Sequence, residues 1–260
     1  MPALVRTCLL LTVAPCLAWV LPRTPARARW ATMYLGQRDT VEIEIADGQT
    51  LRFETGKIGK QAGGSVMAYS GDTMVYSTAC AEAKAQDLDF TPLKIDYLER
   101  FSAAGKTSGA FHRRDGRAAD HEILVARLID RPIRPMLANG WTHDTQLLSW
   151  VLSYDGQQQP DALAVCCASA ALCLSDVPLT KPVAAVQVGL VEGALVLNPT
   201  RDQMDKSSLQ LMIAGTSEAV LMIEVGRERS ARARARAHAL ARDRSPAAGR
   251  GRLSERSSND

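Results

Sequence analysis

The sequence lacks the residue patterns by which many hydrolases and zinc proteins are recognised. Its six cysteines include no Cys-x-x-Cys pair, so a zinc site is unsupported. Its four histidines include no metal-spaced pair with a glutamate, and no Gly-x-Ser-x-Gly nucleophile motif occurs. These absences leave little support for a zinc hydrolase or for a serine hydrolase of the α/β type.

The cysteines do not form a disulfide framework either. Two lie in the N-terminal segment, one in an expected strand and three in an apolar helical stretch: Cys8, Cys16, Cys80, Cys166, Cys167 and Cys173. We interpret the thiols of the folded part as small buried hydrophobic groups, in preference to a redox or metal-binding role.

A glycine-rich segment also lacks the pattern of a nucleotide-binding loop. Gly56, Gly59, Gly63 and Gly64 follow one another closely, but no Gly-Lys-Ser/Thr ending completes a Walker motif. We therefore expect a structural turn between strands here, rather than a phosphate cradle.

Positive charge is scarce in the middle of the chain, although the formal net charge is +3. Residues 1–30 carry four arginines and no acid, and residues 227–260 carry ten arginines against four acids. Residues 31–226 hold the remaining 17 basic and 24 acidic residues. Any affinity of this middle part for nucleic acid must therefore come from a local patch and not from overall charge.

The first 35 residues are typical of a targeting leader. Residues 8–21 are apolar, contain Pro15 and are shorter than the roughly 20 residues that a membrane span needs. Residues 22–30 are rich in arginine and free of acids, as in transit peptides. The tandem arrangement resembles a bipartite plastid leader, with a candidate first cleavage between Ala18 and Trp19. A mitochondrial presequence is the alternative, and a membrane anchor is less favoured.

The last segment, residues 227–260, is composed mainly of arginine, alanine and serine. It has no apolar face and cannot bury enough surface to offset the entropy of ordering, so we expect disorder. A basic RNA-binding tail is one interpretation of this composition. An incomplete or mis-framed gene sequence is the interpretation that we favour.

Residues 36–226 are predicted to form one α+β domain. Strands are expected at 41–45, 51–54, 65–69, 73–81, 94–99 and 145–154, from alternating or β-rich runs bounded by turn residues. Further strands are expected at 183–190, 194–197, 209–213 and 219–225, with a buried helix at 161–175. Strands followed by mixed helix and strand predict two layers, in which a mixed sheet packs on helices.

A second helix is predicted over 120–130, with Asp120 as its cap and Arg127 and Arg131 on one face. Pro132 and Pro135 are expected to end the helix and to hold Arg134 on an extended segment. Cations at the helix end also suit its dipole, which is a purely structural explanation for Arg131.

Arginines crowd the stretch from Phe111 to Pro135, and the first of them follow an aromatic pair. Guanidinium groups fit phosphate oxygens, and aromatic rings stack on the bases of single-stranded nucleic acid. A loop and helix with solvated arginines explain the same spacing about equally well. The candidate RNA-binding residues are Phe111, His112, Arg113, Arg114, Arg117, Arg131 and Arg134.

Five motifs occur in one order that resembles a known family. They are Glu54-Thr-Gly56, Tyr97-Leu-Glu-Arg100, Phe111-His-Arg-Arg114, Leu128-Ile-Asp-Arg-Pro-Ile-Arg-Pro135 and Ala214-Gly-Thr216. The series, from about Val41 to Val225, closely resembles the first RNase PH-like domain of the polynucleotide phosphorylases. The family commonly has two phenylalanines before the arginine pair, whereas this chain has His112 second. A histidine still stacks but buries less apolar area, and it titrates near neutrality.

The resemblance implies phosphorolysis, in which inorganic phosphate attacks the terminal phosphodiester at an RNA 3′ end and releases a nucleoside diphosphate. It implies magnesium and inorganic phosphate for the full enzyme, single-stranded RNA as the substrate and a homotrimeric ring. In that family the catalytic pocket belongs mainly to a second RNase PH-like domain, which has no counterpart here. The first domain supplies the ring interface and an aromatic and arginine constriction for RNA. No catalytic residue or metal ligand is therefore assigned in this chain.

Two classes of function stay open. The chain is either the RNA-binding part of a 3′-to-5′ exoribonuclease, inactive by itself, or a non-catalytic RNA-binding or ring-forming module. A second catalytic domain encoded downstream in the same transcript would favour the first.

Overall fold

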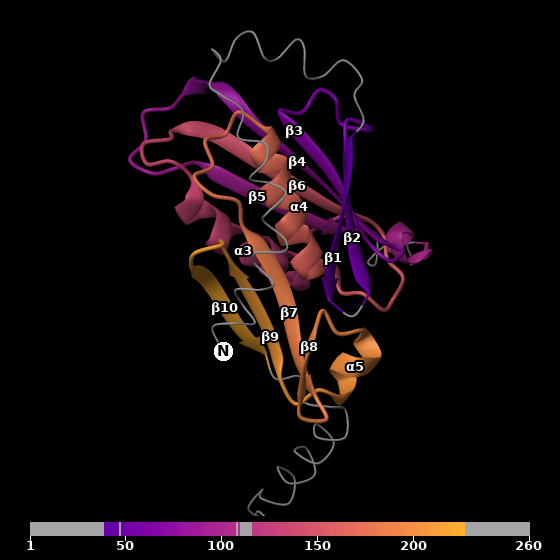
Figure 1. Ribbon diagram of the computed structural model, residues 1–260. Coiled ribbons are helices and arrows are strands. Elements are labelled where there is room, and N and C mark those ends of the chain that lie inside the picture. Colours follow the sequence, from indigo (N-terminus) through magenta and orange to yellow (C-terminus); the bar gives the residue numbers. More distant parts are fainter. Residues whose placement is uncertain (1–38, 47, 108, 110–115, 227–260) are drawn as a thin grey trace, which may run out of the picture. The chain divides into compact units, whose positions relative to one another are not determined.

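The strands of the first sheet pair in an order that differs from their order in the sequence. A computed structural model describes residues 39–46, 48–107, 109 and 116–226. Six strands form the first sheet, in the order β1-β2-β3-β4-β6-β5 (Figure 1). They are β1 (Asp39–Ala46), β2 (Gln49–Thr55), β3 (Gly64–Ser70), β4 (Thr73–Ala85), β5 (Leu93–Glu99) and β6 (His143–Ser153).

The sheet is mixed, because β5 runs parallel to β6 while the other neighbours are antiparallel. Along β4, Val75 and Ala79 are fully buried, and they pair with Val151 and Leu147 of β6. The side chains between these rows point to the other face, where Trp150 and Leu152 are partly exposed. This period of two is the alternation that the sequence predicts for a sheet buried on one face.

Helix α4 (Pro160–Leu174) covers the buried face of the first sheet and contacts β3, β4 and β6. It is apolar nearly all round, and eleven of its residues are buried. Its backbone comes so close to β3 that a β-carbon on Gly64 would lie 2.1 Å from the carbonyl oxygen of Ala171. Glycine is therefore required at position 64 by packing, in agreement with the structural interpretation of this glycine-rich segment.

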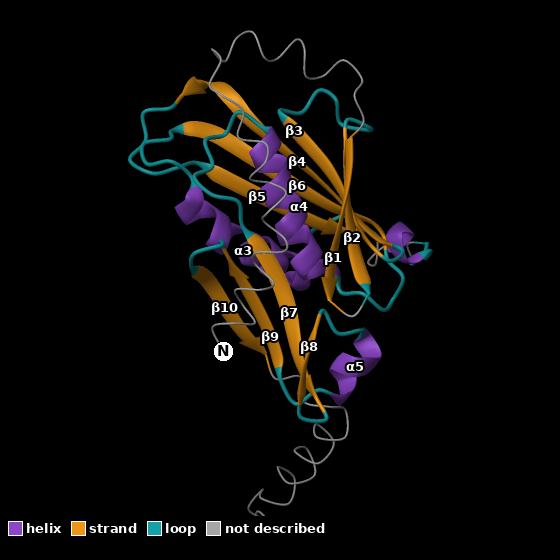
Figure 2. Ribbon diagram, in the orientation of Figure 1, coloured by secondary structure: helices purple, strands orange, loops and turns teal. Residues whose placement is uncertain are grey.

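A second sheet lies on the other side of α4. It contains four antiparallel strands in the order β10-β9-β7-β8: β7 (Ala184–Val191), β8 (Ala194–Leu197), β9 (Gln210–Gly215) and β10 (Val220–Gly226). Helix α4 contacts β7, and helix α3 (Asp120–Ile133) contacts β5 on one side and β10 on the other. The two helices thus form a layer that packs on both sheets, as the secondary-structure colouring shows (Figure 2). The predicted α+β class is confirmed. The expected two layers become three, because the later strands form a second sheet on the other side of the helices.

Helix α3 differs from the prediction at both ends. It begins after Ala119, the N-cap, so Asp120 is its first residue and not its cap. It continues through Pro132 to Ile133, and a 3-10 turn, η4 (Arg134–Met136), follows. The expectation that Pro132 ends the helix and that Arg134 is extended was wrong. The buried proline ring packs in the core, and in the last turn its missing N–H costs the helix only one hydrogen bond.

Two short helical elements were not predicted. A 3-10 turn, η2 (Phe101–Ala104), follows β5, and helix α5 (Arg201–Lys206) lies between β8 and β9. In α5, the side chain of Gln203 accepts a hydrogen bond from the N–H of the N-cap Thr200 at 2.9 Å. The pattern Thr-x-x-Gln was therefore a usable start signal in the sequence.

Candidate nucleic-acid interface

The predicted RNA-binding residues fall into two groups. Phe111, His112, Arg113 and Arg114 lie outside the described residues, as do the predicted leader at 1–35 and the tail at 227–260. Arg117 is described and exposed, two residues before the N-cap of α3. Arg131 and Arg134 lie at the other end of this helix, which is about 20 Å long. Helix α3 therefore separates Arg117 from Arg131 and Arg134.

The side chain of Arg134 connects the end of α3 to the start of β5 by hydrogen bonds. Its guanidinium donates to both carboxylate oxygens of Asp130, at 3.0 and 2.6 Å. It also donates to the backbone carbonyls of Thr91 at 3.0 Å and Leu93 at 3.2 Å. These contacts give Arg134 a structural role in the fold. Its predicted contact with RNA stays a prediction.

Arg131 is less constrained. Its guanidinium lies 3.4 Å from a carboxylate oxygen of Glu224 on β10, and 55% and 48% of the two side chains are exposed. Exposed pairs of this kind contribute little to stability because water and salt screen them. Arg131 therefore keeps an accessible cationic group at the C-terminal end of α3.

Glu122 joins the two ends of the long connection between β5 and α3. One of its carboxylate oxygens accepts from the N–H of Glu99, the last residue of β5, and the other accepts from the N–H of Ala119, both at 2.6 Å. The side chain is buried. In a capping box, the side chain of the third helical residue accepts from the N-cap N–H, as Glu122 does here. The reciprocal bond requires a polar N-cap side chain, which Ala119 lacks. The predicted RNA-binding loop thus has both its flanks held by one carboxylate.

Four more ionisable groups surround this point, and with Glu122 they form the loop-base cluster: Tyr97, Glu99, His121, Glu122 and Asp161. The hydroxyl of Tyr97 donates to Glu99 Oε1 at 2.6 Å, and His121 Nε2 lies 3.3 Å from the same oxygen. One ligand atom each from Glu99, His121 and Asp161 lie within 4.8 Å of one another. The end of β5 and the first turns of α3 and α4 therefore converge here.

The environment shifts the pKa of four of these groups. Burial raises the pKa of Tyr97 far above its usual range, and it raises the pKa of Asp161 to about 6. Burial also acts to raise the pKa of Glu99, but the hydrogen bonds from His121 and Tyr97 outweigh it and leave this pKa below its usual value. The hydrogen bond to Glu99 raises the pKa of His121.

The sequence indicated none of the loop-base cluster as functional. Tyr97 and Glu99 were noticed only as part of a family motif, and an acid in the first turn of a helix, such as Asp161, is explained by the helix dipole. The signal that could have been used was the pair His121 and Glu122 in the first turn after an arginine-rich loop. Bringing them to Glu99 and Asp161 requires the tertiary fold.

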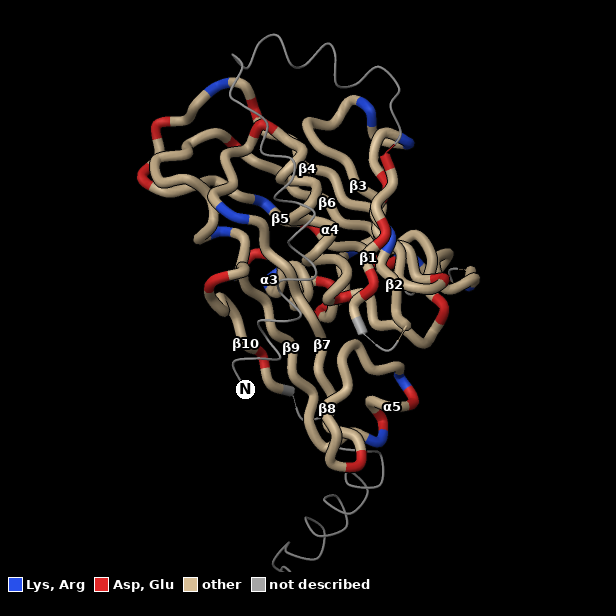
Figure 3. The backbone as a smooth tube through the Cα atoms, in the orientation of Figure 1, with Lys and Arg blue, Asp and Glu red and all other residues tan. Residues whose placement is uncertain are grey.

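Charges of both signs are interspersed along the described part of the chain (Figure 3). At the tip of the second sheet, for example, Lys181 pairs with Glu218. This mixture agrees with the excess of acids in residues 31–226. Any affinity of this part for nucleic acid would therefore depend on local clusters of basic residues.

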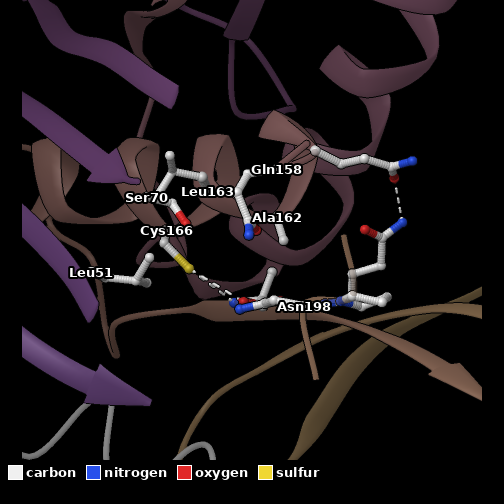
Figure 4. A pocket seen from close by; sticks show the side chains of 11 residues that line it. Leu51, Ser70, Gln158, Ala162, Leu163, Cys166 and Asn198 are labelled. Atoms are coloured by element: carbon white, nitrogen blue, oxygen red, sulfur yellow. Dashed lines mark hydrogen bonds between the residues drawn. The ribbon is translucent and has the colours of Figure 1, made fainter. Parts of the chain in front are cut away.

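One pocket lies beside the first turns of α4, between the two sheets (Figure 4). Gln187 links two of the other amide side chains that line it. Gln187 Nε2 donates to Gln159 Oε1 at 2.5 Å, and the Gln187 N–H donates to Asn198 Oδ1 at 3.1 Å. None of the predicted RNA-binding residues lines this pocket. We interpret it as a packing feature where the sheets meet.

Among the described helices, none has the length and apolar character required to cross a membrane.

Two family profiles match the chain in tandem. The profile described as 3′ exoribonuclease family, domain 1, matches residues 47–178, and that described as domain 2 of the same family matches residues 181–229. The first match covers nearly all of the first sheet together with α3 and α4. The second covers the four-stranded sheet, so it describes the later strands of this chain and not a further RNase PH-like domain.

Curated relatives are similar over most of the chain. A polyribonucleotide nucleotidyltransferase of Protochlamydia amoebophila is 53% identical over 189 residues, which are 72% of this chain and 27% of the relative. A probable polyribonucleotide nucleotidyltransferase 1, chloroplastic, of Oryza sativa subsp. japonica is 50% identical over 186 residues, 71% of this chain and 20% of the relative. The chain thus spans about a quarter of the length of these relatives.

The solved structure of rice (Oryza sativa) Rrp46 is similar in fold. It aligns with a TM-score of 0.54 at 13% identity, covering 79% of this chain and 88% of the rice protein. At this identity the likeness concerns the arrangement of sheets and helices only.

Proposed function

Because the chain belongs to the 3′ exoribonuclease family, whose two domain profiles match it in tandem, we propose that it is the RNA-binding part of a phosphate-dependent 3′-to-5′ exoribonuclease. The proposed whole enzyme is a polyribonucleotide nucleotidyltransferase that acts in RNA degradation and processing. The observation that carries the proposal is the identity of about half of the aligned residues, over 71–72% of the chain, to proteins of that name. The chain by itself is expected to be inactive.

The RNA contact is proposed for the loop that precedes α3. Arg113, Arg114 and Arg117 would hold phosphates, and Phe111 and His112 would stack on bases. The negative charge of the surrounding domain supports this, because a local cationic loop is then the principal attraction for RNA. The anchoring of both loop flanks by Glu122 also supports it, since a loop with fixed ends presents its arginines from a defined position.

Magnesium and inorganic phosphate are implied for the full enzyme. Among the described residues, the group formed by Glu99, His121 and Asp161 does not fit magnesium, which prefers an octahedron of oxygen ligands to a set that includes an imidazole. We therefore propose that both act in the part of the enzyme that this chain does not contain. No catalytic step is assigned to a residue of this chain.

A salt titration tests the RNA contact. In the full chain, Arg113→Ala combined with Arg114→Ala should lower the salt slope of single-stranded RNA binding by roughly 0.7 per lost phosphate contact. Phe111→Ala should instead cost about 1–3 kcal/mol of binding free energy with little change of slope. The arginine-rich tail contributes an equal background in every variant. Arg201→Ala combined with Lys206→Ala, exposed on α5, is the matched control. An unchanged affinity and slope in the loop double variant would show that the loop is a solvated surface.

The proposed inactivity is tested separately. Purified chain, a 3′-labelled oligoribonucleotide, phosphate and magnesium should release no nucleoside diphosphate above a buffer control. Release above the control would place a working pocket in this chain. RNA binding without release would agree with both open classes of function, and sequencing the 3′ end of the transcript then separates them.

We further propose a plastid location and a homotrimeric ring for the whole enzyme, with a mitochondrial location as the alternative. The acid-free, arginine-rich segment at 22–30 and the chloroplastic name of the rice relative support the location. A fluorescent reporter fused to residues 1–40 should enter plastids, and a diffuse cytosolic signal would contradict the leader. Light scattering of the whole enzyme tests the ring, which predicts three times the monomer mass.

A further inference from the structure

The carboxylate of Asp161 lacks a hydrogen-bond partner among the described residues. It lies in the first turn of α4, and no side-chain cap is formed there. The residue is of intermediate exposure, so water also reaches this point. A carboxylate without a hydrogen-bond donor from the protein takes a proton, a water molecule or an ion as its partner. Asp161 is therefore available as a ligand.

The neighbours of Asp161 are groups that bind metals. His121 offers an imidazole nitrogen and Glu99 a carboxylate oxygen, and with the Asp161 oxygen these ligand atoms lie within 4.8 Å of one another. Three metal ligands at about 2.1 Å from a tetrahedral ion lie about 3.4 Å apart. Small side-chain rotations therefore suffice to bring the three atoms onto one ion.

The three ligands are held on separate rigid elements. Glu99 ends β5, where its N–H donates to Glu122 and its carboxylate accepts from Tyr97 at 2.6 Å. His121 and Asp161 stand in the first turns of α3 and α4. Support of this kind orients ligands in known metal sites, where outer groups hydrogen-bond to the ligating carboxylates.

We propose that Glu99, His121 and Asp161 bind one divalent transition-metal cation of the zinc type, with water completing the coordination. One imidazole and two carboxylates suit Zn²⁺ and its substitute Co²⁺ better than Mg²⁺. The site is distinct from the magnesium implied for catalysis in the whole enzyme. It lies at the base of the proposed RNA-binding loop.

The electrostatic surroundings of the proposed site include groups that disfavour a cation and groups that favour it. The N-terminal ends of α3 and α4 each carry about half a positive charge, which disfavours a cation. Two carboxylate ligands outweigh these dipoles, and Glu122 adds a third acid beside them. The bound ion would cross-link the end of β5 to the start of α3, and thus tie both flanks of the loop a second time.

Metal titration of the full chain tests the proposal. After treatment with a chelator, the protein is titrated with Co²⁺ by visible absorption and with Zn²⁺ by calorimetry. We expect one site of nitrogen and oxygen ligands, without the thiolate charge-transfer band that cysteine binding would give. A thousandfold excess of Mg²⁺ should not displace the ion.

Variants assign the site to its residues. His121→Gln and Asp161→Asn should each weaken Zn²⁺ binding by at least about tenfold, the lower end of what a lost outer-shell contact costs. His121 is exposed on its helix, so His121→Gln is expected to fold as the wild type does. The matched control is His143→Gln, which should bind Zn²⁺ unchanged although it alters another histidine of the fold.

Three outcomes would overturn the proposal. The wild type could bind neither Co²⁺ nor Zn²⁺, both variants could bind as the wild type does, or Mg²⁺ could compete at equal concentration. The first would leave Asp161 satisfied by a proton or water. Each of these results is independent of RNA binding, so it leaves the proposed function untouched.

Discussion

The two ends of helix α3 carry charges of opposite sign and use them differently. At the N-terminal end Glu122 is only 8% exposed, and both of its oxygens accept backbone N–H groups. At the C-terminal end the side chains of Arg131 and Arg134 are 55% and 42% exposed and form surface ion pairs. Because water screens the second kind of contact and not the first, the acidic end should matter for stability and the basic end for binding.

The largest effect is expected from Glu122→Ala. The substitution leaves the N–H groups of Glu99 and Ala119 without their acceptor, and hydrogen bonds to a charged group contribute about 1.5–3 kcal/mol each. The free energy of unfolding, measured with urea, should fall by about 3 kcal/mol or more. Glu42→Ala, at an exposed position of β1, is the control and should stay within about 0.5 kcal/mol of wild type. A loss below 1 kcal/mol for Glu122→Ala would show that water replaces the carboxylate.

A smaller effect at the same end is expected from Tyr97→Phe. The ring stays buried, but Glu99 loses the 2.6 Å hydrogen bond from the hydroxyl. The unfolding free energy should fall by about 1–2 kcal/mol, because the Glu99 side chain keeps some access to water. Tyr154→Phe serves as the control, since no hydrogen bond of its hydroxyl is seen within the described part of the chain. An equal loss in both variants would indicate a general effect of removing a hydroxyl.

At the opposite end, Arg134→Ala should cost about 0.5–1 kcal/mol of unfolding free energy. The side chain makes a two-pronged contact with Asp130 and reaches two backbone carbonyls, but it is substantially exposed. Arg134→Lys should recover little of the loss, because an ammonium group cannot reproduce the planar fork. Full recovery by lysine would show that charge alone acts here.

The same contrast explains how much the sequence could predict. The alternation of buried and exposed residues along β4 and β6 depends on local pattern, and those strands were placed correctly. The position of Pro132 inside the helix depends on tertiary packing. Its ring is fully buried, and α3 tolerates it because it stands in the last turn. The rule that a proline ends a helix considers only neighbours in the sequence, so it predicted the end of α3 too early.

The candidate site divides in the same way. The arginine-rich loop could be recognised in the sequence because its arginines are close together. The family motifs then supported an RNA-binding role as the prediction for it. The loop-base cluster brings together residues up to 64 positions apart, from Tyr97 to Asp161, and only the packing of β5, α3 and α4 assembles it. Each of its acids has an ordinary local explanation. Only the missing partner of Asp161 and the double acceptance by Glu122 distinguish them.

The smallest effect on stability is expected from Arg131→Ala. The ion pair with Glu224 spans 3.4 Å between exposed side chains, so its loss should change the unfolding free energy by less than about 0.5 kcal/mol.

The effect of Arg131→Ala on RNA binding should be measurable nonetheless, because the guanidinium is accessible. If it touches a phosphate, Arg131→Ala lowers the salt slope of single-stranded RNA binding by roughly 0.7. Glu224→Gln removes the competing carboxylate and leaves the arginine in place, so it should bind RNA at least as tightly as the wild type. A slope that stays constant in Arg131→Ala, together with unchanged binding in Glu224→Gln, would confine the RNA contact to the N-terminal side of α3. A stability loss above 1 kcal/mol would instead show that the basic end of the helix is structural, and that the difference between its two ends is one of degree.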